Sequence, residues 1–171
     1  MAEYNSGPGW APSNYAGTWS NAVFLAASIV QAIRANVSMF SIFNLQNTGG
    51  DFSWSMMNAR GTLSPEGTLY SDLLPHLAMG QFRDVSIRTS AGNIWAVVSG
   101  DAGHRTLLVV NANPGEAIDL DLNGALSVGA GTTPTTYQWA GSTSGPSVTH
   151  GPLSGDYTIP AEGILMIDFS N

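Results

Sequence analysis

The segment from Val37 to Leu45 constrains the fold more than any other part of this sequence. It reads VSMFSIFNL, and as an extended strand it would carry apolar side chains on both faces. Strands of this kind are typical of parallel sheets with a layer of structure on each side. One such strand has hydrogen-bonding edges that require neighbours. We therefore expect its sheet to be completed by chain outside this sequence or by a second copy of it.

A helix is predicted before this strand, over residues 19–36. Apolar residues recur there at helical spacing and cover nearly the whole circumference. A helix that is apolar almost all round must be buried on more than one face. We expect it to begin near Asn14 or Thr18 and to end near Asn36, which suits a C-terminal cap.

A second helix is predicted after the strand, over residues 64–80. Ser64 is suited to cap it, and Pro65 fits the first helical position. Pro75 lies inside the pattern and should kink or break the helix, because proline lacks the amide proton. The predicted apolar stripe consists of Leu69, Leu73, Leu74 and Leu77.

The hydrophobic period changes to two after Gly80. The segment AIDLDL shows this clearly, with Ile118 and Leu120 expected inside and Asp119 and Asp121 outside. Short strands separated by Gly, Pro, Asn and Asp predict an antiparallel sandwich. The expected strands cover residues 84–90, 93–100, 104–113, 117–124, 135–141, 156–160 and 163–170.

Charge and composition exclude several classes of function. The chain has 12 acidic residues and only 5 basic ones, all of them scattered arginines, so its net charge is −7. Nucleic-acid binding and attachment to an anionic membrane are therefore disfavoured. No stretch reaches the roughly 18 apolar residues of a membrane span. Without cysteine, the chain has neither disulfides nor thiolate sites.

The composition also bears on where the protein works. A glycine-rich surface that is polar but poorly charged suits a secreted or polysaccharide-facing protein. The sequence contains no signal peptide. For the parent protein we expect a secreted or periplasmic location, with the signal lying upstream.

The order of motifs resembles a known group of enzymes. EYNS at residues 3–6 is followed by a Gly/Pro/Trp segment, a helix, FSIFNLQN at 40–47 and GTLSPEGTLYSDLLPHLAMG at 61–80. This layout is similar to the end of a (β/α)8 barrel in the large clan of retaining glycoside hydrolases. That clan includes β-xylosidases, arabinofuranosidases, endoglucanases and xylanases.

The resemblance implies an α+β fold. Residues 1–82 would be the terminal barrel segment, a short helix–strand–helix remnant of a (β/α)8 barrel. Residues 83–171 would be the antiparallel β-sandwich on which it packs.

The resemblance also implies a catalytic residue, Glu3. In the clan the nucleophilic glutamate ends the seventh barrel strand, and the acid/base glutamate ends the fourth. Retaining hydrolysis needs two such carboxyl groups about 5–5.5 Å apart. The acid/base cannot be assigned to this chain, and Asp51, its nearest carboxylate, better fits a turn. The alternative for Glu3 is a solvated glutamate without a role.

Five further residues are candidate contacts to a sugar. Trp10 and Trp54 lie in glycine-rich loops, where their rings would stack on a sugar or pack against the loops. Asn44 and Gln46 follow the strand, where they would bind sugar hydroxyls or cap the strand end. Asn5, two residues after Glu3, belongs to the same group.

Other chemistries find no support in the motifs. The sequence has no G-x-S-x-G motif and no phosphate-binding glycine loop. His76, His104 and His150 lack the spacing of metal ligands, so neither a metal nor a cofactor is expected. We expect His76 to be structural and the other two to lie in turns.

Three functional hypotheses follow. The first is the C-terminal part of a retaining glycoside hydrolase that acts on plant-type polysaccharide, with carbohydrate as partner and with self-association into a homo-oligomer. The second is a non-catalytic carbohydrate-binding or structural sandwich module in which Glu3 is inert. The third is an architectural fragment without a ligand.

Overall fold

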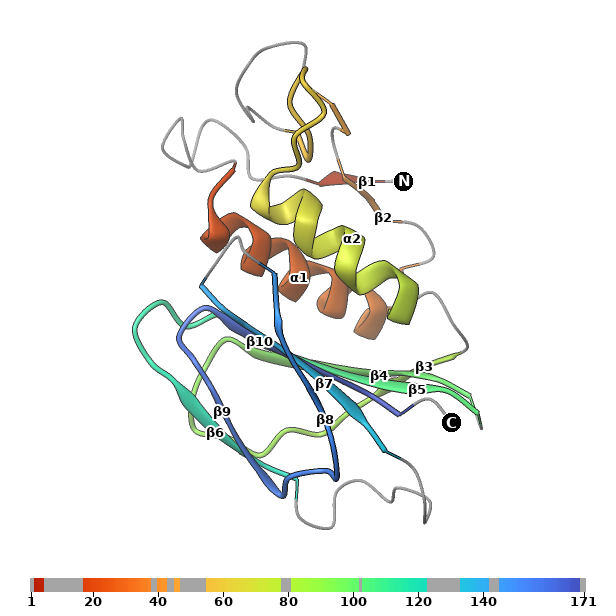
Figure 1. The fold of residues 1–171 in the computed structure, drawn as a ribbon, viewed down its shortest axis with the longest axis vertical. Helices are drawn as coiled ribbons and strands as arrows, with labels where there is room; N and C mark the ends of the chain where they lie inside the picture. Colours follow the sequence, from red (N-terminus) through yellow and green to blue (C-terminus); the bar gives the residue numbers. More distant parts are fainter. Residues whose placement is uncertain are drawn as a thin grey trace.

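The chain folds into stacked layers of helix and sheet, as the computed structural model shows (Figure 1). A small parallel strand pair lies on one side of two helices, and a six-stranded sheet and then a two-stranded sheet lie on the other. The fold is therefore α+β, as predicted. The structure describes residues 2–4, 17–37, 40–42, 45–46, 55–77, 81–101, 103–122, 133–141 and 145–169.

The large sheet is antiparallel throughout. Its strand order is β3-β4-β5-β10-β7-β8, with every neighbouring pair antiparallel. The small sheet pairs β6 with β9, also antiparallel. The bounds are β3 Gln81–Asp84, β4 Ile94–Gly100, β5 Arg105–Asn111, β6 Ile118–Asp121, β7 Thr135–Ala140, β8 Ser147–His150, β9 Asp156–Ile159 and β10 Gly163–Asp168.

Both faces of the large sheet are buried. Leu108 and Met166 belong to a core shared with the helices, while Leu165 and Ile167 belong to a second core under β6 and β9. Strand β10 is buried at all six positions, which explains its continuous apolar run. Side chains alternate along a strand, so the central strands feed both cores at once.

Helix α1 (Trp19–Arg34) begins and ends where its sequence predicts. The Thr18 hydroxyl accepts a hydrogen bond from the Asn21 amide at 3.2 Å, which caps the first turn. At the other end Asn36 has a φ of 53°, a left-handed conformation that terminates helices. The helix packs against both α2 and the large sheet, so the expected burial on more than one face is confirmed.

Helix α2 (Pro65–Leu77) has the predicted cap but not the predicted break. The Ser64 hydroxyl accepts a hydrogen bond from the Gly67 amide at 3.1 Å. The helix runs through Pro75 to Leu77, so the chain does not break at Pro75, while the expected kink stays a prediction. Pro75 lies in the last turn, where few hydrogen bonds remain to be lost. Leu74 is exposed and leaves the predicted stripe, whereas Leu69, Leu73 and Leu77 are buried.

Strands β1 (Ala2–Tyr4) and β2 (Phe40–Ile42) form the parallel pair. Their register sets Glu3 opposite Ser41, and α1 is the crossover between them. Strand β2 is shorter than the predicted strand over 37–45. Val37 and Leu45 lie outside it and are 48% and 68% exposed.

Two strand predictions are corrected. Residues 85–90 do not form the expected strand, although Val85 and Ile87 pack against the second core from an irregular segment. Apolar and polar residues alternate in this segment because every other side chain is buried, and not because the segment pairs with a neighbouring strand. Strand β8 was missed because its four residues are all exposed and carry no apolar pattern. The inward and outward pattern of β6 is confirmed, with exposed aspartates at 119 and 121.

Among the described residues, neither helix is long and apolar enough to cross a membrane.

Candidate functional site

The carboxyl ends of β1 and β2 form the candidate site. Because the strands are parallel, the segments that follow them leave from the same end of the pair. Glu3 is the middle residue of β1, and Gln46 comes four residues after β2. The other predicted contacts, Asn5, Trp10, Asn44 and Trp54, lie outside the described residues, as does Asp51.

Gln46 is exposed and held by a turn. Its Nε2 donates a hydrogen bond to the Asn58 carbonyl at 3.3 Å, and its backbone bridges Met57. The Asn58 carboxamide oxygen accepts bonds from the amides of Arg60 and Thr62, each at 3.0 Å. Asn58 therefore orders the turn that orients Gln46. The sequence signal for it is the N-A-R-G segment at residues 58–61, whose composition is typical of a turn.

A buried carboxylate that sequence reasoning missed lies behind this site. Glu66, in the first turn of α2, is only 3% exposed. Its Oε1 accepts hydrogen bonds from the Gly17 amide at 3.2 Å and from the Asn21 side chain at 3.1 Å. Desolvation raises the pKa of this carboxyl above its ordinary value, and hydrogen bonds from Gly17, Asn21 and Ser64 lower it in part.

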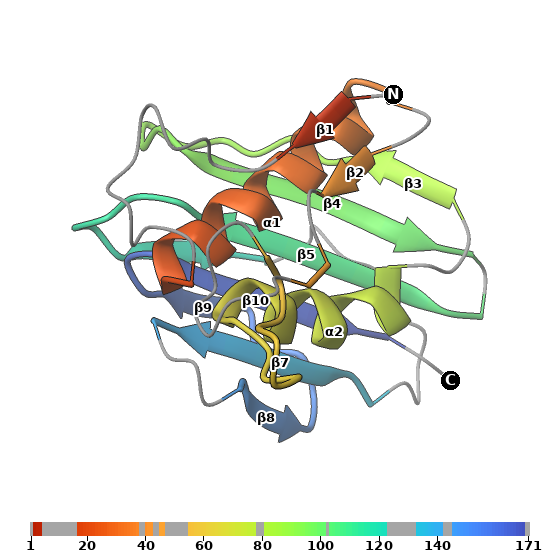
Figure 2. The ribbon, with the colours of Figure 1, turned by 90° about the horizontal axis from the view of Figure 1, so that it is seen from above.

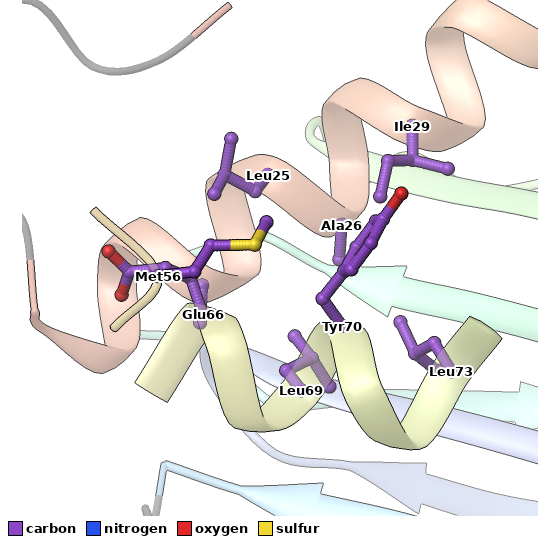
Figure 3. A pocket seen from close by; sticks show the side chains of 9 residues that line it. Leu25, Ala26, Ile29, Met56, Glu66, Leu69, Tyr70 and Leu73 are labelled. Carbon is purple, nitrogen blue, oxygen red and sulfur yellow. The ribbon is translucent and has the colours of Figure 1, made fainter. Parts of the chain in front are cut away.

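Glu66 acts as an anchor rather than as a catalyst. The cavity beside it, between α1 and α2, has a volume of about 10 Å³ and a mostly apolar lining (Figure 3). That is room for one water molecule and not for a sugar. The hydrogen bonds of Glu66 join the start of α2 to Gly17 and to Asn21 in the first turn of α1, so Glu66 ties the starts of the two helices together.

Gly67 lets the preceding loop approach α2 closely. A Cβ atom at this position would lie 2.2 Å from the Met56 carbonyl oxygen, which is too close for any side chain. The same carbonyl accepts a hydrogen bond from the Ser64 amide at 2.8 Å. The segment that carries Asn58 is thus packed directly on the start of α2.

A larger groove lies between the two sheets, with a volume of about 790 Å³. Aliphatic side chains such as Ile94, Leu107 and Ile118 line it, with Arg88 and Asp119 at its polar positions. None of its described lining residues is aromatic. In the described part of the sheets, only Phe82 among the aromatic side chains is exposed. This groove therefore offers, among its described lining residues, no aromatic ring on which a sugar could stack.

A third cluster lies at the C-terminal end of α2, where His76 meets Asp168 and His104. Sequence reasoning treated these histidines separately. His104 lies just before β5 in a turn, as expected, but His150 lies in strand β8 and not in a turn.

Comparison with known proteins gives structural matches only. No family model matches the sequence, and no curated protein matches it. The fold is similar to a family 30 endoxylanase from Clostridium papyrosolvens, with a TM-score of 0.67 and 12% identity over 100% of this chain and 41% of that chain.

Two further solved structures share the arrangement. One is a family 51 α-L-arabinofuranosidase from Bifidobacterium longum, with a TM-score of 0.60 and 19% identity over 93% of this chain and 36% of that one. The other is a family 39 β-xylosidase from Caulobacter crescentus, with a TM-score of 0.57 and 11% identity over 99% and 43%. This chain thus spans about two fifths of the length of these proteins, and the likeness shows a shared fold.

Proposed function

We propose that this chain is the C-terminal part of a retaining glycoside hydrolase that acts on plant-type polysaccharide or its oligosaccharides, with Glu3 as the nucleophile. One observation carries the proposal. A parallel strand pair, joined by a helix and followed by a second helix and a sandwich, holds a glutamate at the next-to-last position of its first strand. The solved structures with this arrangement include an endoxylanase, an arabinofuranosidase and a β-xylosidase.

In this proposal residues 1–82 are the terminal segment of a (β/α)8 barrel and residues 83–171 its accessory sandwich. Strands β1 and β2 would be the last two barrel strands, each followed by its helix, α1 or α2. Active sites of such barrels lie at the carboxyl ends of the strands. That end is where the backbone of Glu3 lies, and where the segment with Gln46 begins.

The chemistry would use Glu3 in two steps. Its carboxylate attacks the anomeric carbon and forms a covalent glycosyl ester, while an acid/base carboxyl, not assigned to this chain, protonates the leaving oxygen. The acid/base then takes a proton from water, which releases the sugar. Asn5, Trp10, Asn44, Gln46 and Trp54 would hold the sugar ring. Of these, Gln46 is exposed and already oriented through Asn58.

The sparse charge of the chain supports a secreted or periplasmic location for the parent protein. A structural neighbour is described as a conserved exported protein from Bacteroides fragilis, which agrees with this proposal.

A trapping experiment tests the nucleophile. The parent protein, which in this proposal supplies the acid/base carboxyl, is incubated with 2-deoxy-2-fluoro glycosides of xylose, arabinofuranose and glucose that carry a good leaving group. The labelled peptide is identified by mass spectrometry. We expect the label on Glu3, because the fluorine slows hydrolysis of the ester. Glu3→Gln should abolish both labelling and turnover of xylan and aryl glycosides. Glu116→Gln, at an exposed glutamate after β5, is the matched control and should retain both.

Two outcomes would contradict the proposal. Turnover that survives Glu3→Gln would remove Glu3 from the mechanism. Binding of polysaccharide without turnover, in both the wild type and Glu3→Gln, would favour the non-catalytic module instead.

A further inference from the structure

Two histidines and one aspartate converge where α2 ends above the large sheet. The Nδ1 atom of His76 lies 2.6 Å from Oδ2 of Asp168, and Nε2 of His104 lies 3.7 Å from Oδ1 of the same carboxylate. The three ligand atoms all lie within 4.8 Å of one another. Two imidazoles and a carboxylate form a donor set that suits zinc and related transition metals.

The rigid elements of the fold hold two of these side chains in place. Asp168 ends β10, is paired with Thr106 and Thr135 on the neighbouring strands, and has a side chain that is 9% exposed. His104 sits in the turn between β4 and β5. There the Asp101 carboxylate accepts bonds from the amides of Gly103 and His104, at 2.8 and 3.1 Å.

The third side chain comes from the helical layer. His76 lies in the last turn of α2, and its carbonyl accepts hydrogen bonds from the hydroxyls of Thr106 and Ser99, at 3.3 and 3.4 Å. The ring of Tyr137 packs against its imidazole with a centroid separation of 5.1 Å. The backbone of the helix end is therefore fixed to the sheet, and its imidazole lies between Tyr137 and Asp168.

We propose that His76, His104 and Asp168 bind a divalent transition-metal ion, with Zn²⁺ as the best fit. Zinc bonds of about 2.0–2.1 Å in a tetrahedral site place neighbouring ligand atoms about 3.3 Å apart. Nε2 of His104 lies 3.7 Å from Oδ1 of Asp168, close to this value. Nδ1 of His76 contacts the other oxygen of that carboxylate, Oδ2, at 2.6 Å, so this contact must open by about 1 Å for an ion to enter between the two groups.

The residues around the cluster favour a positive ion, and the cluster is open to solvent. Asp72 lies one helical turn before His76 and adds a second negative charge on the same face of α2. Arg105 is directed into the turn, where its Nε donates to the Asp101 carbonyl at 3.2 Å. The side chains of His76 and His104 are 20% and 22% exposed, so solvent reaches the cluster. A water molecule would complete the fourth position.

The ion would fasten the helical layer to the sheet. Its three ligands come from α2, from the β4–β5 turn and from β10, so the site exists only when these elements are docked. An ion that binds the folded state and not the unfolded one raises stability by mass action. The inference does not depend on the proposed glycosidase activity.

Calorimetric titration of zinc chloride into the chelator-treated full chain, prepared without a histidine tag, tests the site. We expect one ion per chain and a higher melting temperature when zinc is present. His104→Gln and His76→Gln should each weaken binding by at least about tenfold, since each removes a ligand. The only other histidine, His150, is exposed on β8, so His150→Gln is the matched control and should bind zinc normally.

A second measurement uses the unaltered protein and so does not depend on how the variants fold. Cobalt(II) in place of zinc should give the intense visible bands of a four-coordinate ion. Absence of saturable zinc binding and of these bands in the wild type would overturn the proposal. Binding that survives both glutamine variants, or that His150→Gln removes, would do the same. If His76 and Asp168 form only a hydrogen-bonded pair without a metal, the wild type should show neither saturable zinc binding nor the cobalt bands.

Discussion

The six-stranded sheet and the β1–β2 pair differ in how completely this chain covers them. The sheet has a core on each face, and its central strand β10 is buried at every position. The parallel pair has three residues in each strand, and the helices separate it from the sheet (Figure 1). Seen from above, β1 overlaps α1 (Figure 2). The sheet is thus packed by other parts of this chain, whereas the parallel pair is defined by the backbone pairing of its own two strands.

The large exposed apolar side chains lie at the edges of the sheet and in the segments before it. Of the six among the described residues, two lie on the edge strands β3 and β8, and four lie before β3. That the first half of the chain packs against a further partner stays a prediction, made from the strand pattern of residues 37–45. The residues are Val37, Leu45, Leu63, Leu74, Phe82 and Val148.

The largest expected effect concerns association. If the first half needs a partner, the isolated chain should self-associate, and light scattering should give at least twice the monomer mass of 17.9 kDa. The double change Leu45→Ser and Leu74→Ser should shift the chain toward monomer, because it removes exposed apolar surface. Val148→Ser is the control on the sandwich. A well-folded wild-type monomer would contradict the expectation that the first half of the chain needs a partner.

The next effect tests the closed sheet. Leu165→Ala removes a fully buried side chain from β10 and should lower the free energy of unfolding by about 2–5 kcal/mol in urea titrations. Val148→Ala, at an exposed position on β8, should change it by no more than about 0.5 kcal/mol. Equal losses in the two variants would mean that the sheet core is not where the stability lies.

A smaller effect tests the helical layer. Ser64→Ala removes the oxygen that caps α2 through the Gly67 amide, and should cost about 1 kcal/mol. Ser71→Ala, at an exposed position inside the same helix, should be neutral or slightly stabilising, since alanine favours helix. Thermal or urea unfolding measures both. A cap variant as stable as the Ser71 variant would count against the assigned start of α2.

The smallest effect is a change in pH dependence. Because burial raises the folded-state pKa of Glu66 above its ordinary value of 4.5, the folded protein holds the proton between the two values. The stability from this carboxyl is greatest below the ordinary pKa and is lost as the pH rises through the folded value. Glu66→Gln should therefore unfold with a flatter pH profile than the wild type.

Urea unfolding at a series of pH values measures this difference. Other carboxyls with a shifted pKa, such as Asp72, are present in both proteins, so their contribution to the pH dependence cancels in the comparison. The exposed Glu116→Gln should keep the wild-type profile. A Glu66→Gln profile parallel to the wild type would show that the carboxyl is not desolvated.

Local signals predicted much of the fold. The caps at Thr18 and Ser64 and the left-handed end at Asn36 depend on side chains within four residues, and all three are found. Apolar alternation located most strands of the sandwich. It failed for residues 85–90, where burial alternates without pairing, for β3, which lies just before them, and for β8, which is exposed at every position.

The candidate sites were less predictable. Glu3 came from a resemblance and its role stays a prediction, as do the roles of Asn5, Trp10, Asn44, Gln46 and Trp54. Glu66 carries no local sign of burial, because Gly17 and Asn21, which donate to it, lie 49 and 45 residues away.

The sequence by itself determined the two helices with their caps, the change to strand periodicity, the absence of thiol chemistry and the presence of a strand within residues 37–45. Each of these follows from near neighbours or from composition. Only the tertiary structure decided that Glu66 is desolvated and that His76 meets Asp168, 92 residues away. Such contacts depend on how layers stack, and a one-dimensional pattern records which faces are apolar but not which faces meet.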